Sequence, residues 1–219
     1  MPRGALIIFE GIDGCGKGTQ INLLERRLAE IGLADQVVWN KEPGGTALGE
    51  EIRKVLFETV TTHAMDVNAC SLLYLVSQLQ ALHEVVLPAL AEDKVVISDR
   101  WDKFSGTVFG LKALRVPVSR CVLLLRRELL RLTPDLIIWL RGDPDTFFSR
   151  ATGRTSEVHE QGKAWADPEK LKLLQQTYGE VFLSLDTENV MPVDVRPEDG
   201  PEQIFAQKIW PAVLRVLQD

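Results

Sequence analysis

The sequence has few cysteines, few histidines and no excess of positive charge. Its 219 residues include three cysteines and three histidines. These are too few and too scattered for a disulfide framework or a zinc site, so we expect free thiols in a reducing cytoplasm. The formal net charge of -6 argues against a large nucleic-acid footprint, which needs a basic face. We therefore expect no nucleic-acid partner.

Long uninterrupted apolar runs are also scarce. The first run, Ala5 to Phe9, ends at Glu10 and is too short for the apolar core of a signal peptide. No stretch is expected to reach bilayer-spanning length, which predicts a cytoplasmic protein with no membrane partner. Apolar residues make up 45% and charged residues 26%, an ordinary globular balance. We expect one domain covering residues 1–219.

Short apolar runs alternate with segments of helical periodicity. The runs that we expect to form strands are Ala5–Phe9, Val37–Trp39, Lys94–Ser98, Leu136–Leu140 and Met191–Val193. The expected helices include Lys17–Ile31, Ala69–Leu90 and Pro201–Leu217. Apolar strands separated by helices indicate a parallel sheet covered on both faces. The fold class is therefore α/β, with three layers, α/β/α, around five parallel strands. The polar segment 152–168 lies between two further helix candidates and predicts a short mobile lid.

A glycine-rich segment follows the first strand and precedes the first helix. Gly11, four intervening residues and then Gly16-Lys17 match the P-loop spacing. Glycines allow left-handed turns and a close approach to phosphate oxygens, while backbone N–H groups and the helix N-terminus face the anion. Lys17 adds a mobile positive charge, so the pattern predicts ATP binding. The expected ATP-binding residues are Gly11, Asp13, Gly14, Cys15, Gly16, Lys17, Gly18 and Thr19.

Two positions bear on magnesium and phosphate. Gly18 stands where a P-loop normally has a Ser or Thr for Mg2+, which leaves the metal ligands open between Thr19 and Asp99. Asp99 follows a buried strand, where open α/β sheets bind ligands, and can hold magnesium or its waters. Arg100, the next residue, can clamp a phosphate bidentately.

An ordered set of segments resembles the thymidylate kinase family. The segments that carry this resemblance are Gly4–Gln20, Lys41–Thr46 (Lys-Glu-Pro-Gly-Gly-Thr), Leu72–Tyr74, Asp99–Trp101 and Thr133–Leu136. Lys41 replaces the usual Arg of the second segment, and Arg53 stands where bacterial members also have Arg. The resemblance implies a P-loop kinase that moves the terminal phosphoryl group of ATP-Mg2+ onto thymidine monophosphate in deoxynucleotide biosynthesis.

The resemblance also implies roles at the acceptor. Asp13 matches the residue that reaches the sugar 3′-hydroxyl, Tyr74 the one that stacks on thymine, and Phe109 the one that walls off the ribose 2′ side. Tyr74 has an alternative interpretation as a core aromatic. Gln78 replaces an Arg that donates to thymine O4, so the base preference stays open. The other implied acceptor-binding residues are Glu42, Arg53, Arg100 and Ser105.

Two arginines begin the lid. Arg150 and Arg154 flank Gly153, and family members without a P-loop arginine usually carry catalytic arginines in this segment. The implied catalytic set is Lys17, Arg100, Arg150 and Arg154. The lid arginines have an alternative interpretation as solvated surface groups.

Two other functions remain open from the sequence. Gln78 leaves room for another or a broader nucleoside monophosphate kinase. Gly18 leaves room for a regulatory P-loop module that binds nucleotide without efficient transfer. The resemblance further implies a homodimer, for which the helix Ala69–Leu90 offers an apolar surface.

Overall fold

The computed structural model describes residues 4–62, 65–101, 124–125, 128–153, 167–184 and 189–218. The described strands are β1 (Ala5–Glu10), β2 (Val37–Lys41), β3 (Val95–Asp99), β4 (Leu136–Gly142) and β5 (Val190–Val195). The longer helices are α1 (Lys17–Glu30), α2 (Ala47–Thr62), α3 (Val67–Ala81), α7 (Pro144–Thr152), α9 (Pro168–Ser184) and α11 (Trp210–Gln218). Short helical segments are η1 (Ala34–Gln36), η2 (Leu82–Val86), α4 (Leu87–Ala91), α10 (Pro201–Ile204) and η4 (Phe205–Ile209). All five expected strands are present.

The five strands form one all-parallel sheet in the order β2-β3-β1-β4-β5. The chain leaves β1 for the far strand β2, returns to β3 beside β1, and then crosses to β4 on the other side of β1. The direction of strand addition therefore reverses at β1. In open α/β sheets, ligands bind outside the carboxyl ends of the strands at such a reversal.

The strand register brings polar side chains together at this carboxyl edge. Asn40 of β2 pairs with Ser98 of β3, and Ser98 pairs with Ile8 of β1. Because side chains alternate between faces, Glu10 lies on the same face as Ile8, two residues closer to the edge. Trp139 of β4 pairs with Glu10 and continues this row. One face of the sheet thus ends in polar groups, although Leu6, Ile7, Ile8 and Phe9 are fully buried.

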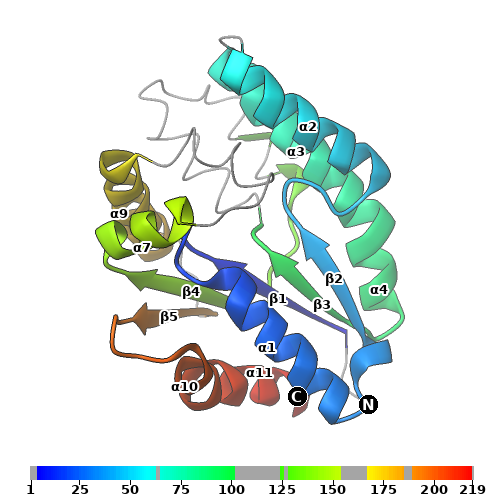
Figure 1. Ribbon diagram of the computed structural model, residues 1–219. Coiled ribbons are helices and arrows are strands. Elements are labelled where there is room, and N and C mark those ends of the chain that lie inside the picture. Colours follow the sequence, from blue (N-terminus) through cyan, green and yellow to red (C-terminus); the bar gives the residue numbers. More distant parts are fainter. Residues whose placement is uncertain are drawn as a thin grey trace.

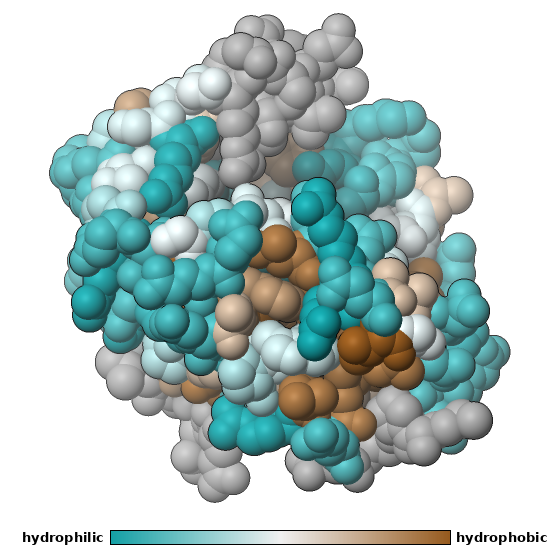
Figure 2. All heavy atoms as spheres, turned by 60° about the horizontal axis from the view of Figure 1, so that its bottom comes forward, coloured by the Kyte–Doolittle hydropathy of each residue, from teal (hydrophilic) through white to brown (hydrophobic). Residues whose placement is uncertain are grey.

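Helices cover both faces of the sheet (Figure 1). On one face α1 packs against α10 and η4, and α1 and α11 contact β1. On the other face α4 contacts β3, and α9 places Phe182 against Trp139 with ring centroids 5.2 Å apart. Figure 2 brings the bottom of Figure 1 forward and shows a mostly hydrophilic surface with small, separate hydrophobic areas. This pattern fits helices that bury one side against the sheet.

Helices α3, η2 and α4 form one continuous apolar helix. Its segment Asn68–Ala91 has 24 residues and contains an apolar window with a mean hydropathy of 1.3. By length and composition it is able to cross a membrane, so the expectation that no segment reaches this length was wrong. A window of this helix is 44% buried inside the fold, and core helices pass the same test, so the observation is weak support for a membrane span.

Helix α2 was not expected from the sequence. It packs along α3, and the two lie together beside β2 (Figure 1). Ile52 and Leu56 are its buried apolar residues, whereas Leu48 and Val55 are exposed. Because apolar residues lie on both the buried and the exposed side of α2, the sequence shows no clear apolar stripe. The helix is recognised only from its packing on α3.

Candidate active site

The P-loop joins β1 to α1 through three glycines with positive φ. Gly11 has φ 140°, Gly14 φ 81° and Gly16 φ 102°, values that other residues rarely adopt. Gly16 is the N-cap of α1, and no side chain caps this helix. Its first backbone N–H groups are therefore not blocked by a capping side chain. A helix N-terminus of this kind, reached through a glycine turn, fits an anionic phosphate.

Helix α7 presses directly on the P-loop. A Cβ added at Gly14 would lie 2.0 Å from the carbonyl oxygen of Phe147, far inside van der Waals contact. A Cβ at Gly11 would lie 2.5 Å from the carbonyl oxygen of Leu140. Gly14 is thus required by the close approach of α7 as well as by its φ. The two sequence-distant segments form one wall of the site.

Lys17 lies inside the loop that it follows. Its side chain is buried, and Nζ donates to the carbonyl oxygens of Gly11 at 2.9 Å and Ile12 at 3.3 Å. Cys15 Sγ lies 3.9 Å from the same ammonium. Burial raises the pKa of the Cys15 thiol, although the Lys17 charge opposes this shift. Cys15 is therefore a neutral buried thiol, and its backbone N–H donates to the Ile12 carbonyl at 3.4 Å.

The Asp99–Trp101 turn lies beside the P-loop and is held in an unusual conformation. Arg100 has φ 74°, which is uncommon for a residue with a Cβ. Its backbone N–H donates to Phe9 at 2.9 Å, and its carbonyl accepts from Ser98 Oγ at 2.7 Å. The next N–H, of Trp101, donates to Glu10 Oε1 at 2.8 Å. A left-handed residue persists where its surroundings hold it from several sides, as they do here.

The Arg100 guanidinium joins the turn to the P-loop. Nη1 donates to the Gly11 carbonyl at 2.9 Å and to the Tyr178 hydroxyl at 3.1 Å, while Nη2 donates to Asp13 Oδ1 at 2.5 Å. The Arg100 side chain is 14% exposed, whereas that of Asp13 is 49% exposed. Partial burial raises the pKa of Asp13, but the charges of Arg100 and Lys17 together lower it below its ordinary value. Asp13 is thus an ionised acceptor at the mouth of the site.

Asp99 fits a magnesium ion with few protein ligands. Its Oδ1 is buried and accepts no hydrogen bond within the described residues. The described chain has no cluster of three or more His, Cys, Asp or Glu that would cage a metal. Mg2+ commonly takes one or two carboxylates and completes its shell with phosphate and water oxygens, which agrees with a single carboxylate here. Thr19 and Gly18 are both exposed on the first turn of α1.

The loop after β2 adds a third wall. The Glu42 N–H donates to the Asp99 carbonyl at 2.9 Å, and the buried Glu42 Oε1 accepts from Asn40 Nδ2 at 3.3 Å. Arg53 of α2 donates to the Pro43 carbonyl at 2.9 Å. Its charge contributes to lowering the pKa of Asp13. Glu42 and Arg53 are therefore close to the site, each held by the backbone of its neighbours.

The remaining expected residues lie on helices α3 and α7 or outside the described residues. Gln78 is fully buried on α3 and Tyr74 is half-buried on the same helix. Arg150 is exposed on α7, with its guanidinium 5.8 Å from the Phe147 ring centroid. Ser105, Phe109 and Arg154 lie outside the described residues, as does the central part of the expected lid.

Two residues of the site were not expected from the sequence. Glu10 is fully buried at the end of β1, and Tyr178 is fully buried on α9. Glu10 could have been recognised from the sequence, because it is a charged residue at the end of an apolar strand. A carboxylate in such a place is buried and needs hydrogen-bond partners. Tyr178 has no comparable signal, since it resembles any aromatic on the buried side of a helix.

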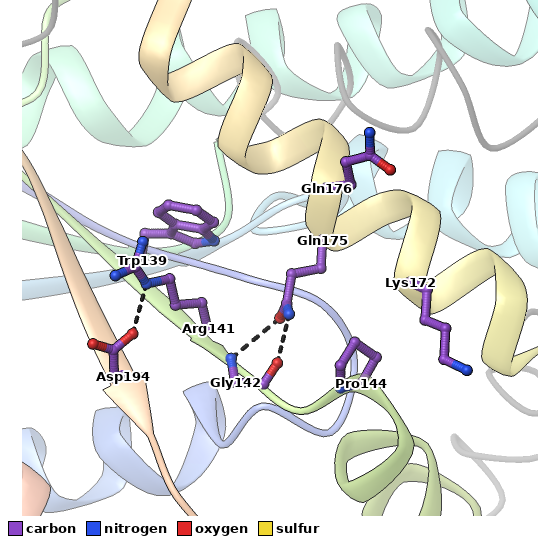
Figure 3. A pocket seen from close by; sticks show the side chains of 8 residues that line it. All are labelled: Trp139, Arg141, Gly142, Pro144, Lys172, Gln175, Gln176 and Asp194. Atoms are coloured by element: carbon purple, nitrogen blue, oxygen red, sulfur yellow. Dashed lines mark hydrogen bonds and ion pairs between the residues drawn. The ribbon is translucent and has the colours of Figure 1, made fainter.

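A shallow hollow beside β4 is a separate feature, shown in Figure 3. Arg141 pairs there with Asp194 at 2.7 Å, and Lys172 pairs with Asp145 at 3.3 Å. Gln175 of α9 accepts from the Gly142 N–H at 3.2 Å and donates to the Gly142 carbonyl at 2.5 Å (Figure 3). The two ion pairs balance the charges of Arg141 and Lys172. The two Gln175 hydrogen bonds connect α9 to the end of β4.

The P-loop, the neighbouring Asp-Arg turn and the strand order together define a class of protein. They are the features of a P-loop α/β kinase of the nucleoside monophosphate type, in which two phosphates meet at the carboxyl edge of the sheet.

The comparisons with known proteins define the family. The thymidylate kinase family model matches residues 9–198. A thymidylate kinase of Synechococcus sp. (strain CC9902) is 34% identical over 169 residues, covering 74% of this chain and 79% of that protein. One from Pelotomaculum thermopropionicum is 35% identical over 74% of this chain and 70% of that protein. The chain belongs to the thymidylate kinase family.

Two further comparisons agree. A thymidylate kinase of Geotalea daltonii is 46% identical over 98 residues, which cover 45% of this chain and 44% of that protein. The crystal structure of thymidylate kinase from Ehrlichia chaffeensis superposes with a TM-score of 0.71 at 22% identity, covering 100% of both chains. This structural match supports the fold.

Proposed function

We propose that this protein transfers the terminal phosphoryl group of ATP to thymidine monophosphate, which gives thymidine diphosphate and ADP. The observation that carries this proposal is the position of Arg100. Its guanidinium lies between the P-loop carbonyl of Gly11 and the ionised Asp13, where a donor phosphate and an acceptor nucleotide would meet. The names of the family relatives supply the identity of the acceptor.

On the donor side, the P-loop N–H groups would hold the ATP phosphates. Gly14 and Gly16 give the loop its shape, and the uncapped start of α1 adds several N–H donors. Lys17 would leave the carbonyls of Gly11 and Ile12 to bind phosphate oxygens, which are stronger acceptors because they are charged.

On the acceptor side, Asp13 would accept from the sugar 3′-hydroxyl and Arg100 would bind the acceptor phosphate. Tyr74 would stack on the base, and Gln78 would read its edge by hydrogen bonding without a charge. The other residues in the proposed acceptor site are Glu42, Arg53, Ser105 and Phe109.

The reaction needs charge neutralisation more than proton transfer. The acceptor is already an anionic phosphate, so the protein has to bring two polyanions together and offset their repulsion. Lys17 and Arg100 supply permanent positive charge. We propose that Arg150, which lies on α7 just before the lid, and Arg154, which lies within the lid (residues 152–168), add further positive charge. Asp99 and Thr19 would hold Mg2+, which would add further neutralisation of the phosphate oxygens. Closing the lid would exclude water and suppress ATP hydrolysis.

A coupled ADP-release assay with ATP-Mg2+ tests the proposal directly. The acceptors are the ribo- and deoxynucleoside monophosphates, each supplied in turn. We expect a strong preference for thymidine monophosphate. Comparable turnover with several acceptors would reassign the protein to a broader kinase and point to Gln78. ATP binding without turnover on any acceptor, by folded protein, would contradict phosphoryl transfer altogether.

We also propose that the protein is a cytoplasmic homodimer. The support is the apolar side of α3, where Leu72 is 39% and Val76 45% exposed; these residues are one helical turn apart and share a face. Light scattering coupled to gel filtration should give twice the monomer mass of 24.5 kDa. Val76→Glu should shift the mass towards the monomer, and an unchanged mass would exclude this face as the interface.

A further inference from the structure

Glu10 is a charged group in the most buried part of the molecule. Its side chain is fully buried at the end of a strand whose other residues are all apolar. Burying an ionised carboxylate without partners costs several kcal/mol. Its two oxygens have separate partners: Oε1 accepts from the Trp101 N–H at 2.8 Å and Oε2 accepts from the Tyr178 hydroxyl at 2.9 Å. Both partners are connected to Arg100: Trp101 is the next residue in the chain, and the Tyr178 hydroxyl accepts a hydrogen bond from the Arg100 guanidinium.

Trp101 connects Glu10 to Arg100 through the backbone. Arg100 immediately precedes Trp101 and has φ 74°, so the peptide between them is the one whose orientation Glu10 holds. Ser98 holds the carbonyl side of the same peptide at 2.7 Å. The Glu10 carboxylate thereby helps to keep Arg100 in a left-handed conformation that the residue would otherwise rarely adopt.

Tyr178 connects Glu10 to Arg100 through the side chain. A carboxylate only accepts hydrogen bonds, so the Tyr178 hydroxyl must use its single proton for Glu10. Its lone pair is then free to accept from Arg100 Nη1 at 3.1 Å. Burial and the Glu10 charge raise the pKa of Tyr178 well above its ordinary value, so the hydroxyl keeps its proton. The hydroxyl thus has a fixed direction between a carboxylate and a guanidinium.

Helix α9 holds Tyr178 rigidly. The Tyr178 ring stacks on Phe182 with centroids 5.8 Å apart, and Phe182 packs on Trp139. One turn earlier, Gln175 binds both backbone groups of Gly142. The ring and its helix are therefore anchored to the sheet, which fixes the hydroxyl in space.

We infer that Tyr178 and Glu10 are positioning residues that hold the Arg100 guanidinium in its phosphate-binding orientation. The inference rests on the proposed function, because it gives Arg100 the acceptor phosphate as its ligand. It also means that the acceptor site depends on α9, a helix that follows the lid in the chain and contributes no residue to the expected acceptor site.

Tyr178→Phe tests the inference by removing one oxygen and keeping the ring. We expect kcat/KM for thymidine monophosphate to fall about tenfold, the usual effect of losing a hydrogen bond to a charged group. The KM for ATP should stay within about twofold, because the P-loop N–H groups are untouched. Thr177→Val is the matched control: Thr177 is buried on the same helix, and its hydroxyl donates only to Leu173 of that helix within the described contacts.

A double-mutant cycle separates positioning from general stability. Lysine cannot reproduce the described guanidinium contacts of Arg100 with Gly11, Asp13 and Tyr178. In an Arg100→Lys background, Tyr178→Phe should therefore change kcat/KM by less than about twofold. Glu10→Gln, which replaces one accepting carboxylate oxygen by an amide NH2 of similar size and removes the charge, should also lower acceptor kcat/KM and be non-additive with Tyr178→Phe. A tenfold loss that persists in the Arg100→Lys background, or an equal loss in Thr177→Val, would overturn the inference.

The same experiment distinguishes a failure of the proposed function from a failure of the positioning inference. If wild-type protein transfers no phosphate to any nucleoside monophosphate, the proposed function fails. If the wild type transfers phosphate and Tyr178→Phe matches it in every constant, only the positioning inference fails.

Discussion

The P-loop and the Asp99–Trp101 turn lie side by side at the carboxyl edge of the sheet, but they are held in different ways. The P-loop takes its shape from three glycines within six residues, and its lysine binds carbonyls of the loop itself. The Asp99–Trp101 turn takes its shape from groups on other strands and on α9. The P-loop is shaped mainly by its own glycines and lysine, with α7 packed against Gly14. The Asp99–Trp101 turn is shaped by tertiary contacts.

This difference has a consequence for mutations. A change in the P-loop acts on the residues that would contact ATP, whereas a change around the turn acts through Arg100 from a distance. Single substitutions in the two regions separate these effects.

Lys17→Ala should lower kcat by about a hundredfold to a thousandfold, because it removes a fixed charge from the transferring phosphate. The fold should persist, since the ammonium donates only to loop carbonyls and Cys15 within the described contacts. Steady-state kinetics and circular dichroism measure the two effects. Near-native turnover would remove Lys17 from the catalytic set.

Gly14→Ala should lower the free energy of unfolding by about 2 to 4 kcal/mol, because it adds a steric clash to an unfavourable φ. The new Cβ would meet the Phe147 carbonyl oxygen at 2.0 Å. Gly16→Ala is the control: its φ is also positive, but no atom lies within 4 Å of the added Cβ. Urea unfolding should show a clearly smaller loss for Gly16→Ala, and equal losses would refute the contact with α7.

Arg100→Lys should raise the KM for the acceptor about tenfold, because one ammonium cannot reproduce a planar fork with several contacts. It should also shift the pH dependence. The Arg100 charge lowers the pKa of Asp13, so weakening that pairing raises this pKa, and the acid limb of acceptor kcat/KM should move to higher pH. An unchanged acid limb would show that Asp13 does not control acceptor binding.

Gly18→Ser should have the smallest effect and should be favourable. Nothing lies within 4 Å of a Cβ added there, and glycine in a helix costs about 0.5 to 1 kcal/mol relative to better helix formers. Thermal unfolding should show a slightly more stable protein. A hydroxyl at this position should also lower the Mg2+ concentration that gives half-maximal activity, and a rise would argue that Gly18 is needed as glycine.

The fold and the P-loop were predictable because their signals are local. Apolar runs bounded by glycine and charge marked all five strands, and the Gly11–Lys17 spacing marked the anion cradle with its three left-handed glycines. Helix α2 was missed because exposed Leu48 and Val55 blur its periodicity. The apolar length of Asn68–Ala91 was underestimated because single polar residues inside a helix do not interrupt it.

The Arg100 environment was only half predictable. Asp99 and Arg100 stood out by their place after a strand, and Asp13 by its place in the loop. Their mutual contacts, and the parts of Glu10 and Tyr178, depend on a strand register and on a helix 78 residues further along the chain. No local pattern contains that information.

The sequence by itself determined the strands, the P-loop and the Asp99–Arg100 pair. Glycine geometry, charge and apolar periodicity act over a few neighbouring residues, so these features can be recognised locally. Only the tertiary structure decided how the Arg100 side chain is aimed. That orientation arises where β1, β3 and α9 meet, and there a buried carboxylate and a tyrosine hydroxyl are satisfied by the same arginine turn.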